Sequence, residues 1–174
     1  MLTDSATLVP LAAVPDAAID ALLDAAFGPD RRTRTAYHIR TGTKPLAQLS
    51  FALVEAEMPI ATIQCWPVAL ESDLGAVYPL VMIGPVAVLP HRQRDGLGRK
   101  LMVHMLEAAA NGGQDKALML IGDPEYYGRF FGFSAERTAK WRAPGPVEAR
   151  RLLARGTLVP QVAGLLRPRP PLAG

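Results

Sequence analysis

"LPHRQRDGLGRKLMVHMLEAAANGG", residues 89–113, places two glycines, Gly96 and Gly98, among four basic side chains, directly before a helical pattern. Apolar residues recur at helical spacing over 100–111, and an Asn-Gly-Gly sequence is a typical helix end. Glycine adopts positive φ readily, so backbone N–H groups here can converge on an anion. The positive end of the following helix points into the same space. We therefore expect a loop that binds phosphate, and its size suits a diphosphate.

The letters of this stretch exclude two common phosphate loops. A dinucleotide-binding G-x-G-x-x-G would need glycine at position 101, where Leu101 stands, and a P-loop would need lysine after Gly98, where Arg99 stands. What remains is Q-R-D-G-L-G between a strand pattern and a helix pattern.

The strand pattern before the loop holds Gly84-Pro85 inside an otherwise apolar run over 77–89. Proline cannot donate to a sheet ladder, so the strand either bulges here or lies at a sheet edge. A bulge would free the backbone N–H and C=O groups of 86–88. Bulge, phosphate loop and helix in succession predict one groove for a long ligand that ends in phosphate.

Composition indicates a globular protein. A chain of 174 residues is long enough to bury its own core. No apolar run reaches the roughly 18 residues of a membrane span, and no basic leader precedes an apolar segment. Cys65 is the single cysteine and the three histidines are scattered, so we expect neither a disulfide nor a metal site. A cytoplasmic location with no membrane partner fits best.

Charge is distributed unevenly along the chain. Residues 1–136 hold 11 Lys/Arg against 15 Asp/Glu, a net −4, whereas residues 137–174 hold 8 against 1, a net +7. The prolines of the terminal "RPRPPLAG" favour extended, unpacked chain. We therefore expect one domain over 1–160 and a Pro/Arg-rich tail over 161–174. A nucleic-acid arm is the less favoured interpretation of this tail, because no aromatic side chains interleave with its late arginines.

Periodicity and turn residues predict a mixed α/β fold. The first part reads as a strand, two helices and three strands, of which the first two strands form an antiparallel pair around a tight turn. A strand, a helix and a strand follow, which implies parallel neighbours joined by a right-handed crossover. The predicted strands span 6–12, 49–56, 60–70, 77–89 and 117–121, and the predicted helices span 15–27, 30–42 and 100–111.

The glycine loop resembles the acetyl-CoA-binding core of the GNAT family of N-acetyltransferases, whose signature is [Q/R]-x-x-G-x-[G/A] after a bulged strand. Gln93, Gly96 and Gly98 stand at the signature positions. "GDPEYYGRFFGF", residues 122–133, is similar to the family's final motif, a tyrosine-bearing helix before Gly-Phe and a strand. The chain is most similar to small single-domain members with G-P-[LV]-A-V-x-P and G-D-P-x-Y-Y-x-R-F. The resemblance covers about residues 77–135 and implies the GNAT fold, in which the central sheet is splayed.

The resemblance implies acetyl-CoA as cosubstrate and assigns a binding role to each matching residue. The strand backbone would bond the pantetheine arm and polarise the acetyl carbonyl, the loop amides would hold the diphosphate, and Gln93 would brace the loop. Arg92 joins the loop's own basic residues as a source of positive charge for the phosphates, and the side chain of Asp95 is expected to turn outward. The implied cofactor-binding residues are Val86, Ala87, Val88, Gln93, Arg94, Asp95, Gly96, Leu97, Gly98, Arg99 and Lys100.

Catalysis in this family needs few side chains. A neutral amine attacks the thioester directly, and a hydroxyl protonates the departing CoA thiolate. Tyr127 matches the position of that acid, but "RFFGF" carries one extra phenylalanine, which leaves Tyr126 as the alternative. Cys65 is expected to be a small buried side chain, with an acyl-cysteine as a minor alternative. No base is assigned among the acids nearest in the sheet, which are Glu55, Glu71 and Asp73.

Three functions remain open from the sequence. The favoured one is an acetyl-CoA-dependent N-acyltransferase that acts on a small amine or on a protein amine. The second is a non-catalytic CoA-binding sensor or partner module, and the third and least favoured is a nucleic-acid-binding protein. Basic segments near the ends of the chain favour an acceptor with a carboxylate or phosphate group. A homodimer is compatible with all three.

Overall fold

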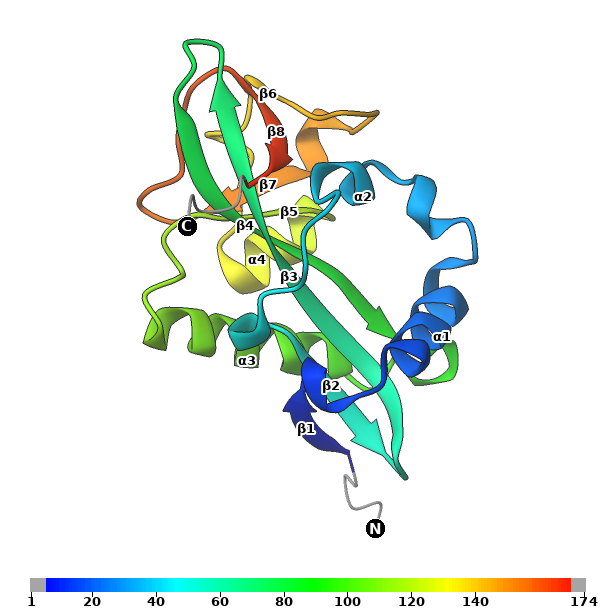
Figure 1. Ribbon diagram of the computed structural model, residues 1–174. Coiled ribbons are helices and arrows are strands. Elements are labelled where there is room, and N and C mark those ends of the chain that lie inside the picture. The colour runs from blue at the N-terminus through cyan, green and yellow to red at the C-terminus, as the bar shows by residue number, and fades with distance from the viewer. Residues whose placement is uncertain (1–5, 170–174) are drawn as a thin grey trace, which may run out of the picture. The chain divides into compact units, whose positions relative to one another are not determined.

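The computed structural model describes residues 6–169 and contains both strands and helices (Figure 1). The strands form one open sheet in the order β1-β2-β3-β4-β5-β7, in which β8 also pairs with β3 and β6 pairs with β8. Antiparallel and parallel pairs both occur, so the predicted mixed α/β class is confirmed. The elements are β1 (Thr7–Pro10), α1 (Asp16–Phe27), α2 (Thr35–Ile39), β2 (Phe51–Glu55), β3 (Met58–Ser72), β4 (Val77–Val88), α3 (Leu97–Asn111), β5 (Leu118–Ile121), α4 (Pro124–Phe131), β6 (Trp141–Arg142), β7 (Leu152–Arg155) and β8 (Gly164–Pro168).

The chain divides into two units that share the long strands β3 and β4. Within the described residues, unit 1 comprises 6–32, 45–65 and 85–112, and unit 2 comprises 33–44, 66–84 and 113–169. Unit 1 therefore holds the glycine loop, and unit 2 holds the tyrosine-bearing helix. No helix among residues 6–169 is both long and apolar enough to cross a membrane.

A tight hairpin organises the strands of unit 1. Strands β2 and β3 pair antiparallel from Phe51↔Ile63 to Glu55↔Met58, which confirms the predicted pair. The two turn residues, Ala56 and Glu57, have φ of 51° and 66°. Positive φ at both positions is the geometry of a two-residue hairpin whose twist matches that of the flanking strands.

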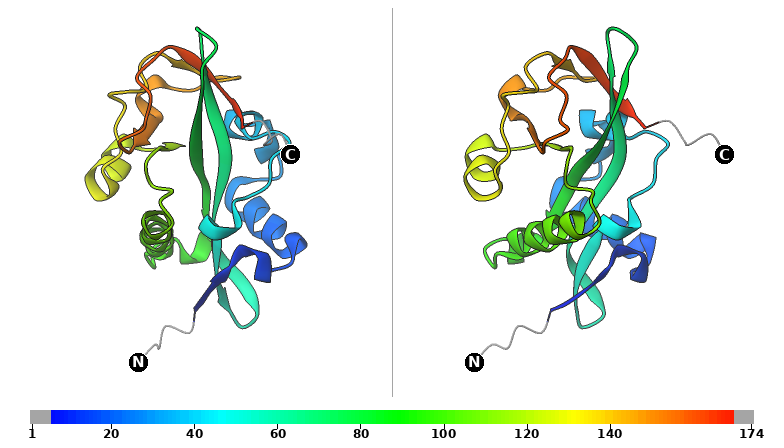
Figure 2. Two further views of the ribbon diagram at one scale, coloured as in Figure 1. Left: turned by 60° about the vertical axis from the view of Figure 1, so that its left-hand side comes forward. Right: turned by 90° about the vertical axis from the view of Figure 1, so that its left-hand side faces the viewer.

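Helices α1 and α3 cover opposite faces of the unit 1 strands (Figure 2). Helix α1 confirms the predicted helix, and its buried residues Ile19, Leu22 and Leu23 pack with Ala52 and Ala87 of the strands. Apolar residues at this spacing line one side of a helix, so the sequence pattern is sufficient to explain why this side of α1 packs on the strands. Helix α3 begins three residues before its predicted start at 100, and it lies on the face of the strands opposite α1.

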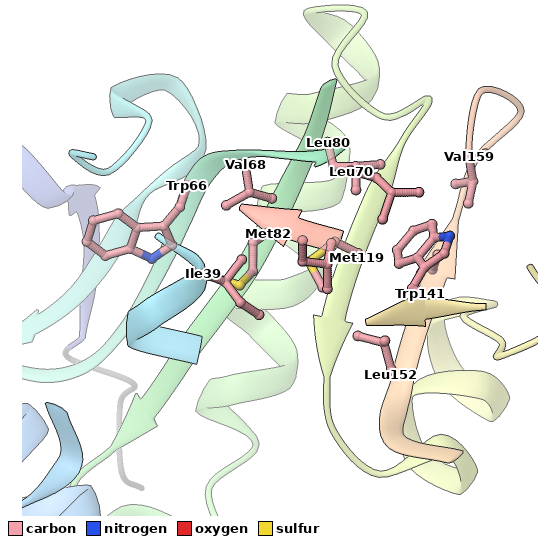
Figure 3. Close-up of a cluster of buried hydrophobic side chains, with 12 residues drawn as sticks. Ile39, Trp66, Val68, Leu70, Leu80, Met82, Met119, Trp141, Leu152 and Val159 are labelled. Carbon is pink, nitrogen blue, oxygen red and sulfur yellow. The ribbon is translucent and has the colours of Figure 1, made fainter. Parts of the chain in front are cut away.

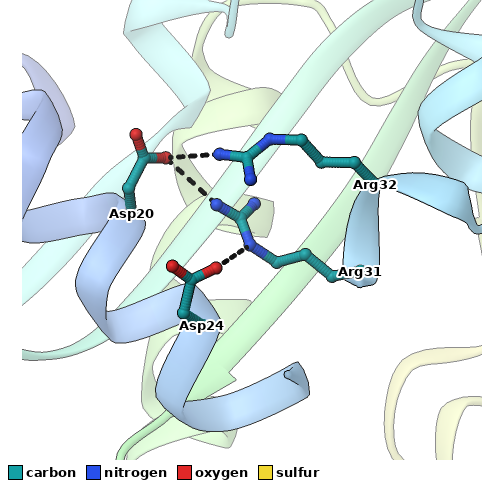
Figure 4. Close-up of polar contacts among 4 residues, drawn as sticks. All are labelled: Asp20, Asp24, Arg31 and Arg32. Carbon is teal, nitrogen blue, oxygen red and sulfur yellow. Dashed lines mark hydrogen bonds and ion pairs between the residues drawn. The ribbon is translucent and has the colours of Figure 1, made fainter. Parts of the chain in front are cut away.

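The polar helix predicted after α1 is wrong in length, because Arg31 turns back onto α1 (Figure 4). Its Nε donates to Asp24 Oδ1 at 2.9 Å and its Nη2 to Asp20 Oδ1 at 3.2 Å. The two carboxylates are four residues apart and so share one face of α1. Both carboxylates bind the Arg31 side chain, which is only 2% exposed, so Arg31–Thr33 forms a single 3-10 turn. Only Thr35–Ile39 of the predicted segment forms an α-helix.

The strand–helix–strand prediction is confirmed by β4 and β5. These strands are parallel neighbours, with Val81 opposite Leu118 and Met82 opposite Met119. Strand β7 then pairs antiparallel with β5. The core of unit 2 gathers side chains from α2 and from six strands (Figure 3), among them Ile39, Trp66, Val68, Leu70, Leu80, Met82, Met119, Trp141, Leu152, Ala154 and Leu166.

The unpacked tail predicted for the C-terminal segment is wrong for residues 164–168, which form β8. This strand pairs antiparallel with β3, from Val68↔Pro168 to Ser72↔Gly164, and Leu166 is fully buried. Strand β3 is much longer than β2, so its later part offers an edge that β8 covers. The proline ends the strand, where a missing N–H is tolerated. Residues 170–174 of the tail lie outside the described residues.

Candidate active site

Strand β4 departs from regular strand geometry at Gly84, where φ is 125°. Its parallel pairing with β5 covers only Val81 and Met82, so residues 83–88 extend beyond the last paired position. Side chains alternate along this stretch. Ala87 is fully buried in the α1 cluster, whereas Val86 is half-buried and points to the other face. The predicted irregularity is present, and it falls where β5 no longer covers β4.

The glycine loop follows β4 through a 3-10 turn and ends at Gly96, which adopts the left-handed conformation with φ 72° and ψ 18°. The Lys100 N–H donates to Gly96 O at 3.1 Å, so α3 starts directly after this glycine. A helix leaves the N–H groups of its first turn without intrahelical acceptors, which here include those of Leu97 and Gly98. Leu97 is buried and anchors the turn, while the loop residues before it are exposed.

Loop and strand are in direct contact at Gly98. A Cβ at this position would lie 3.5 Å from Val86 Cγ1 and 3.7 Å from Val88 Cγ2. The start of α3 therefore packs on the part of β4 that β5 does not cover. The strand and the helix N-terminus, which follow one another in the sequence, therefore also lie close together in space within unit 1.

Arg92, expected to supply charge for phosphate, is engaged by two carboxylates of the protein. Its Nη1 donates to Glu55 Oε1 at 3.0 Å, and its Nε donates to Asp95. Asp95 is exposed and pairs with Arg92 on the surface of the loop. The two carboxylates offset the guanidinium charge, and the pair with Glu55 ties the loop to β2. Gln93, the predicted brace, is exposed.

Helix α4 has the start that its sequence predicts. Asp123 caps it, since Oδ1 accepts from the Glu125 N–H at 3.0 Å, and Pro124 occupies the first turn. The helix runs to Phe131 and ends at Gly132, which has φ 74°. The extra phenylalanine is therefore accommodated inside the helix, before the glycine.

The two tyrosines of α4 have different surroundings. The ring of Tyr127 lies over the end of β5, because a Cβ at Gly122 would come within 2.5 Å of Tyr127 Cε2. Burial raises the pKa of the Tyr127 phenol above its ordinary value, so the group keeps its proton well beyond neutral pH. Tyr126 packs beside Phe130 and Phe131, with ring centroids 5.3 Å and 5.7 Å away, and Phe131 also lies 6.2 Å from the Tyr127 ring.

The acids considered as bases are all held in ion pairs. The Arg142 guanidinium beside Asp73 lowers the pKa of that carboxyl, mainly through hydrogen bonding. A carboxylate whose pKa is lowered is a weaker base. The pairs are Glu55–Arg92, Glu71–Arg167 and Asp73–Arg142.

Cys65 is fully buried, as predicted, and burial raises the pKa of its thiol. A nucleophilic cysteine needs a thiolate, so this environment disfavours an acyl-cysteine. Among residues 6–169 no three His, Cys, Asp or Glu side chains gather into a set able to hold a metal ion.

Many of the basic side chains near the C-terminus bind the protein itself. Arg142 and Arg167 pair with carboxylates of the β3–β4 hairpin region, and Arg137 donates to the Gly156 carbonyl at 3.1 Å. Arg169 donates to Val68 O at 3.3 Å and to Leu80 O at 2.6 Å. The positive charge that suggested a nucleic-acid arm is thus partly engaged within unit 2.

Sequence reasoning missed Arg40, which is 6% exposed. Its guanidinium carbon lies 4.0 Å from the centre of the Tyr37 ring and 3.8 Å from that of Trp66. Its Nη1 donates to Gly84 O at 3.3 Å. The spacing of Tyr37 and Arg40 on one helix face was the only local signal, and nothing in the linear sequence relates them to Gly84.

Comparisons with known proteins agree with this arrangement. The model of the acetyltransferase (GNAT) family matches residues 17–133. A GNAT family N-acetyltransferase (YhbS) from Escherichia coli, solved in complex with CoA, is 24% identical with a TM-score of 0.71, over 97% of this chain and 94% of that one. A GNAT family acetyltransferase from Brucella melitensis, solved in complex with acetyl-CoA, is 28% identical with a TM-score of 0.59, over 88% and 97%. No curated protein matches the chain. Because the family match extends from α1 through the glycine loop to the end of the tyrosine motif, this protein belongs to the GNAT family of acetyltransferases.

Proposed function

We propose that this protein is an N-acetyltransferase that moves the acetyl group of acetyl-CoA to a primary amine by direct attack on the thioester. The observation that carries the proposal is the contact of Gly98 with Val86 and Val88. It joins an uncovered strand backbone to a helix N-terminus, the shape that a long ligand with a diphosphate needs. Family membership and the acetyl-CoA bound to the Brucella melitensis relative support the same ligand.

The diphosphate would lie on the N–H groups at the start of α3, from Gly96 to Gly98. These groups are donors without intrahelical partners, and the helix dipole adds partial positive charge there. Arg94, Arg99 and Lys100 are exposed around them and are suited to the outer phosphate oxygens. Arg92 would keep the loop in place through its pair with Glu55. The pantetheine arm would run along the backbone of residues 86–88.

Acetyl transfer then asks for three things. The amine must be neutral, because an alkylammonium with a pKa of about 10.4 has no lone pair to attack with. Its proton goes to solvent, since the three carboxylates considered as bases, Glu55, Glu71 and Asp73, are ion-paired. The oxyanion that forms at the thioester carbon needs fixed donors, and the N–H groups of Val86 and Val88 are suited to this. The CoA thiolate needs a proton as it leaves, and Tyr127, whose pKa burial raises, retains one to give. The proton that the nitrogen loses as the amide forms returns to the Tyr127 phenolate through solvent.

Calorimetry with acetyl-CoA, followed by an assay of thiol release over a panel of primary amines, tests the proposal. We expect binding and amine-dependent release of CoA. Binding with no release for any small or protein amine would instead identify a non-catalytic CoA-binding module. Absence of binding would remove the proposal altogether.

Tyr127→Phe tests the assignment of the acid, with Tyr126→Phe as the matched control on the same helix. We expect Tyr127→Phe to lower kcat by about 10²- to 10⁴-fold while the Kd for acetyl-CoA is unchanged, because a phenol acts only as the thiolate departs. Tyr126→Phe should keep most of its activity. The opposite pattern would transfer the role to Tyr126.

A further inference from the structure

The Gly84 carbonyl is bound in a way that is unusual for a strand. In a regular sheet this oxygen accepts an N–H from a neighbouring strand. Here two side chains donate to it, the Trp66 indole Nε1 at 2.7 Å and the Arg40 Nη1 at 3.3 Å. Both donors come from other segments of unit 2, and they meet on the oxygen that immediately precedes Pro85.

Arg40 is itself rigidly held. Its guanidinium lies against the rings of Tyr37 and Trp66, and Arg40 follows the end of α2. That helix is fixed by the fully buried Ile39 and by Thr35, whose Oγ1 donates to Pro146 O at 2.6 Å. A guanidinium is planar and charged at every accessible pH, so its hydrogen bond to the carbonyl is charge-assisted. The Gly84 carbonyl therefore has a well-defined direction.

The orientation of the Gly84 carbonyl limits the orientation of the Val86 N–H, because few free torsions separate them. The peptide between Gly84 and Pro85 is planar, and the proline ring fixes its own φ. The ψ torsion of Pro85 is then the one soft backbone torsion between the Gly84 carbonyl and the Val86 N–H. Gly84 itself is at φ 125°, a conformation that other residues rarely adopt. Whatever holds the carbonyl of Gly84 thus restricts where the next N–H along the strand points.

We propose that Arg40, together with Trp66, is a positioning residue for acetyl transfer: it orients the Gly84–Pro85 peptide so that the Val86 N–H points at the acetyl carbonyl. Arg40 touches neither cosubstrate and acts through the strand backbone. This inference rests on the proposed function, because it assumes that the Val86 N–H serves as a donor to the thioester.

Arg40→Met keeps a side chain of similar length without the donor, and Trp66→Phe keeps a ring without the indole N–H. We expect either change to lower kcat by about 10- to 100-fold, the scale of a donor displaced by about 1 Å. The Kd for acetyl-CoA should stay within about threefold, because the diphosphate loop is unchanged. Arg40→Lys, which keeps a charged donor, should recover part of the loss. The double variant should lose less than the product of the two effects, since both residues hold one oxygen.

Arg142→Met is the matched control, because it removes an exposed arginine of the same unit whose partner, Asp73, lies in the β3–β4 turn and not beside Gly84. Its kcat should equal that of the wild type. Thermal unfolding of each variant, with and without acetyl-CoA, verifies that a folded and saturated protein is compared. If Arg40→Met and Trp66→Phe keep wild-type kcat, or if they weaken acetyl-CoA binding as much as they lower kcat, the positioning role is wrong.

Infrared spectroscopy of bound acetyl-CoA labelled with ¹³C at the acetyl carbonyl separates this inference from the proposed function. We expect the wild-type protein to lower the carbonyl stretching frequency and Arg40→Met to lose most of that shift. A shift that persists in Arg40→Met would overturn the role of Arg40 while leaving the polarised thioester intact. If wild-type protein binds acetyl-CoA without any shift, the backbone donor of the proposed function fails, and the inference fails with it.

Discussion

Alanine substitutions at Gly96 and at Gly98 should have opposite effects, although the two glycines are separated by a single residue. Gly96 has φ 72°, and a Cβ there would meet nothing within 4 Å. Gly98 lies inside α3, and its Cβ would make ordinary contact with Val86 and Val88 at 3.5 Å and 3.7 Å. The cost at Gly96 is therefore one of backbone conformation alone, and Gly98→Ala is a matched control for the size of the added methyl.

The magnitude follows from the backbone angles. A left-handed conformation costs a residue with a Cβ about 1–2 kcal/mol, and the smaller freedom of the unfolded chain returns about 0.4–1 kcal/mol. Gly96→Ala should then lower the free energy of unfolding by about 0.5–1 kcal/mol. Gly98→Ala has no conformational cost and should raise it by about 0.4–1 kcal/mol. The difference of about 1.5 kcal/mol corresponds to about 3–6 °C in Tm for a chain of this size.

Acetyl-CoA binding should separate the variants further. If the backbone of the Gly96→Ala variant relaxes toward negative φ at this position, the first turn of α3 shifts and the diphosphate loses a donor. A hydrogen bond to a charged group is worth about 1.5–3 kcal/mol, so the Kd should rise about 10- to 100-fold. Gly98→Ala should bind nearly as the wild type does. Thermal unfolding and calorimetry measure both quantities. Equal Tm and equal Kd for the two variants would refute the argument that a left-handed residue forms the loop.

Two further substitutions test other parts of the description. Cys65→Ala should leave kcat unchanged, because a buried thiol with a raised pKa takes no part in direct attack; loss of activity in a variant that still binds acetyl-CoA would revive an acyl-cysteine. Leu166→Ala should lower the free energy of unfolding by about 2–5 kcal/mol in urea titrations, because β8 buries this side chain completely. A change of less than about 0.5 kcal/mol would mean that the C-terminal segment is not packed on β3.

Local patterns were enough to predict most elements. The helical spacing in α1, the turn between β2 and β3 and the cap at Asp123 each depend on residues a few positions apart. The glycine loop was recognisable for the same reason, because Gly96 acts through its own φ and the helix that follows it. Such features depend on local sequence and do not require knowledge of which distant segments pack against them.

Contacts between distant residues were not predictable in this way. The helix after α1 is interrupted because Arg31 pairs with carboxylates 7 and 11 residues earlier, a choice that helical propensity does not reveal. Arg92 pairs with Glu55, 37 residues away, and so connects the loop to β2. In both cases a basic residue in a basic stretch had a more specific partner elsewhere.

The sequence by itself determined α1, the β2–β3 hairpin, the glycine loop with α3, and the tyrosine-bearing helix, since each arises from interactions within a short stretch of chain. Only the tertiary structure decided that β8 lies along β3 and that Arg40 and Trp66 meet on the Gly84 carbonyl. The physical reason is the same for both. Strand register and core packing choose which distant groups come within hydrogen-bonding range, and many alternative partners have identical local sequence preferences.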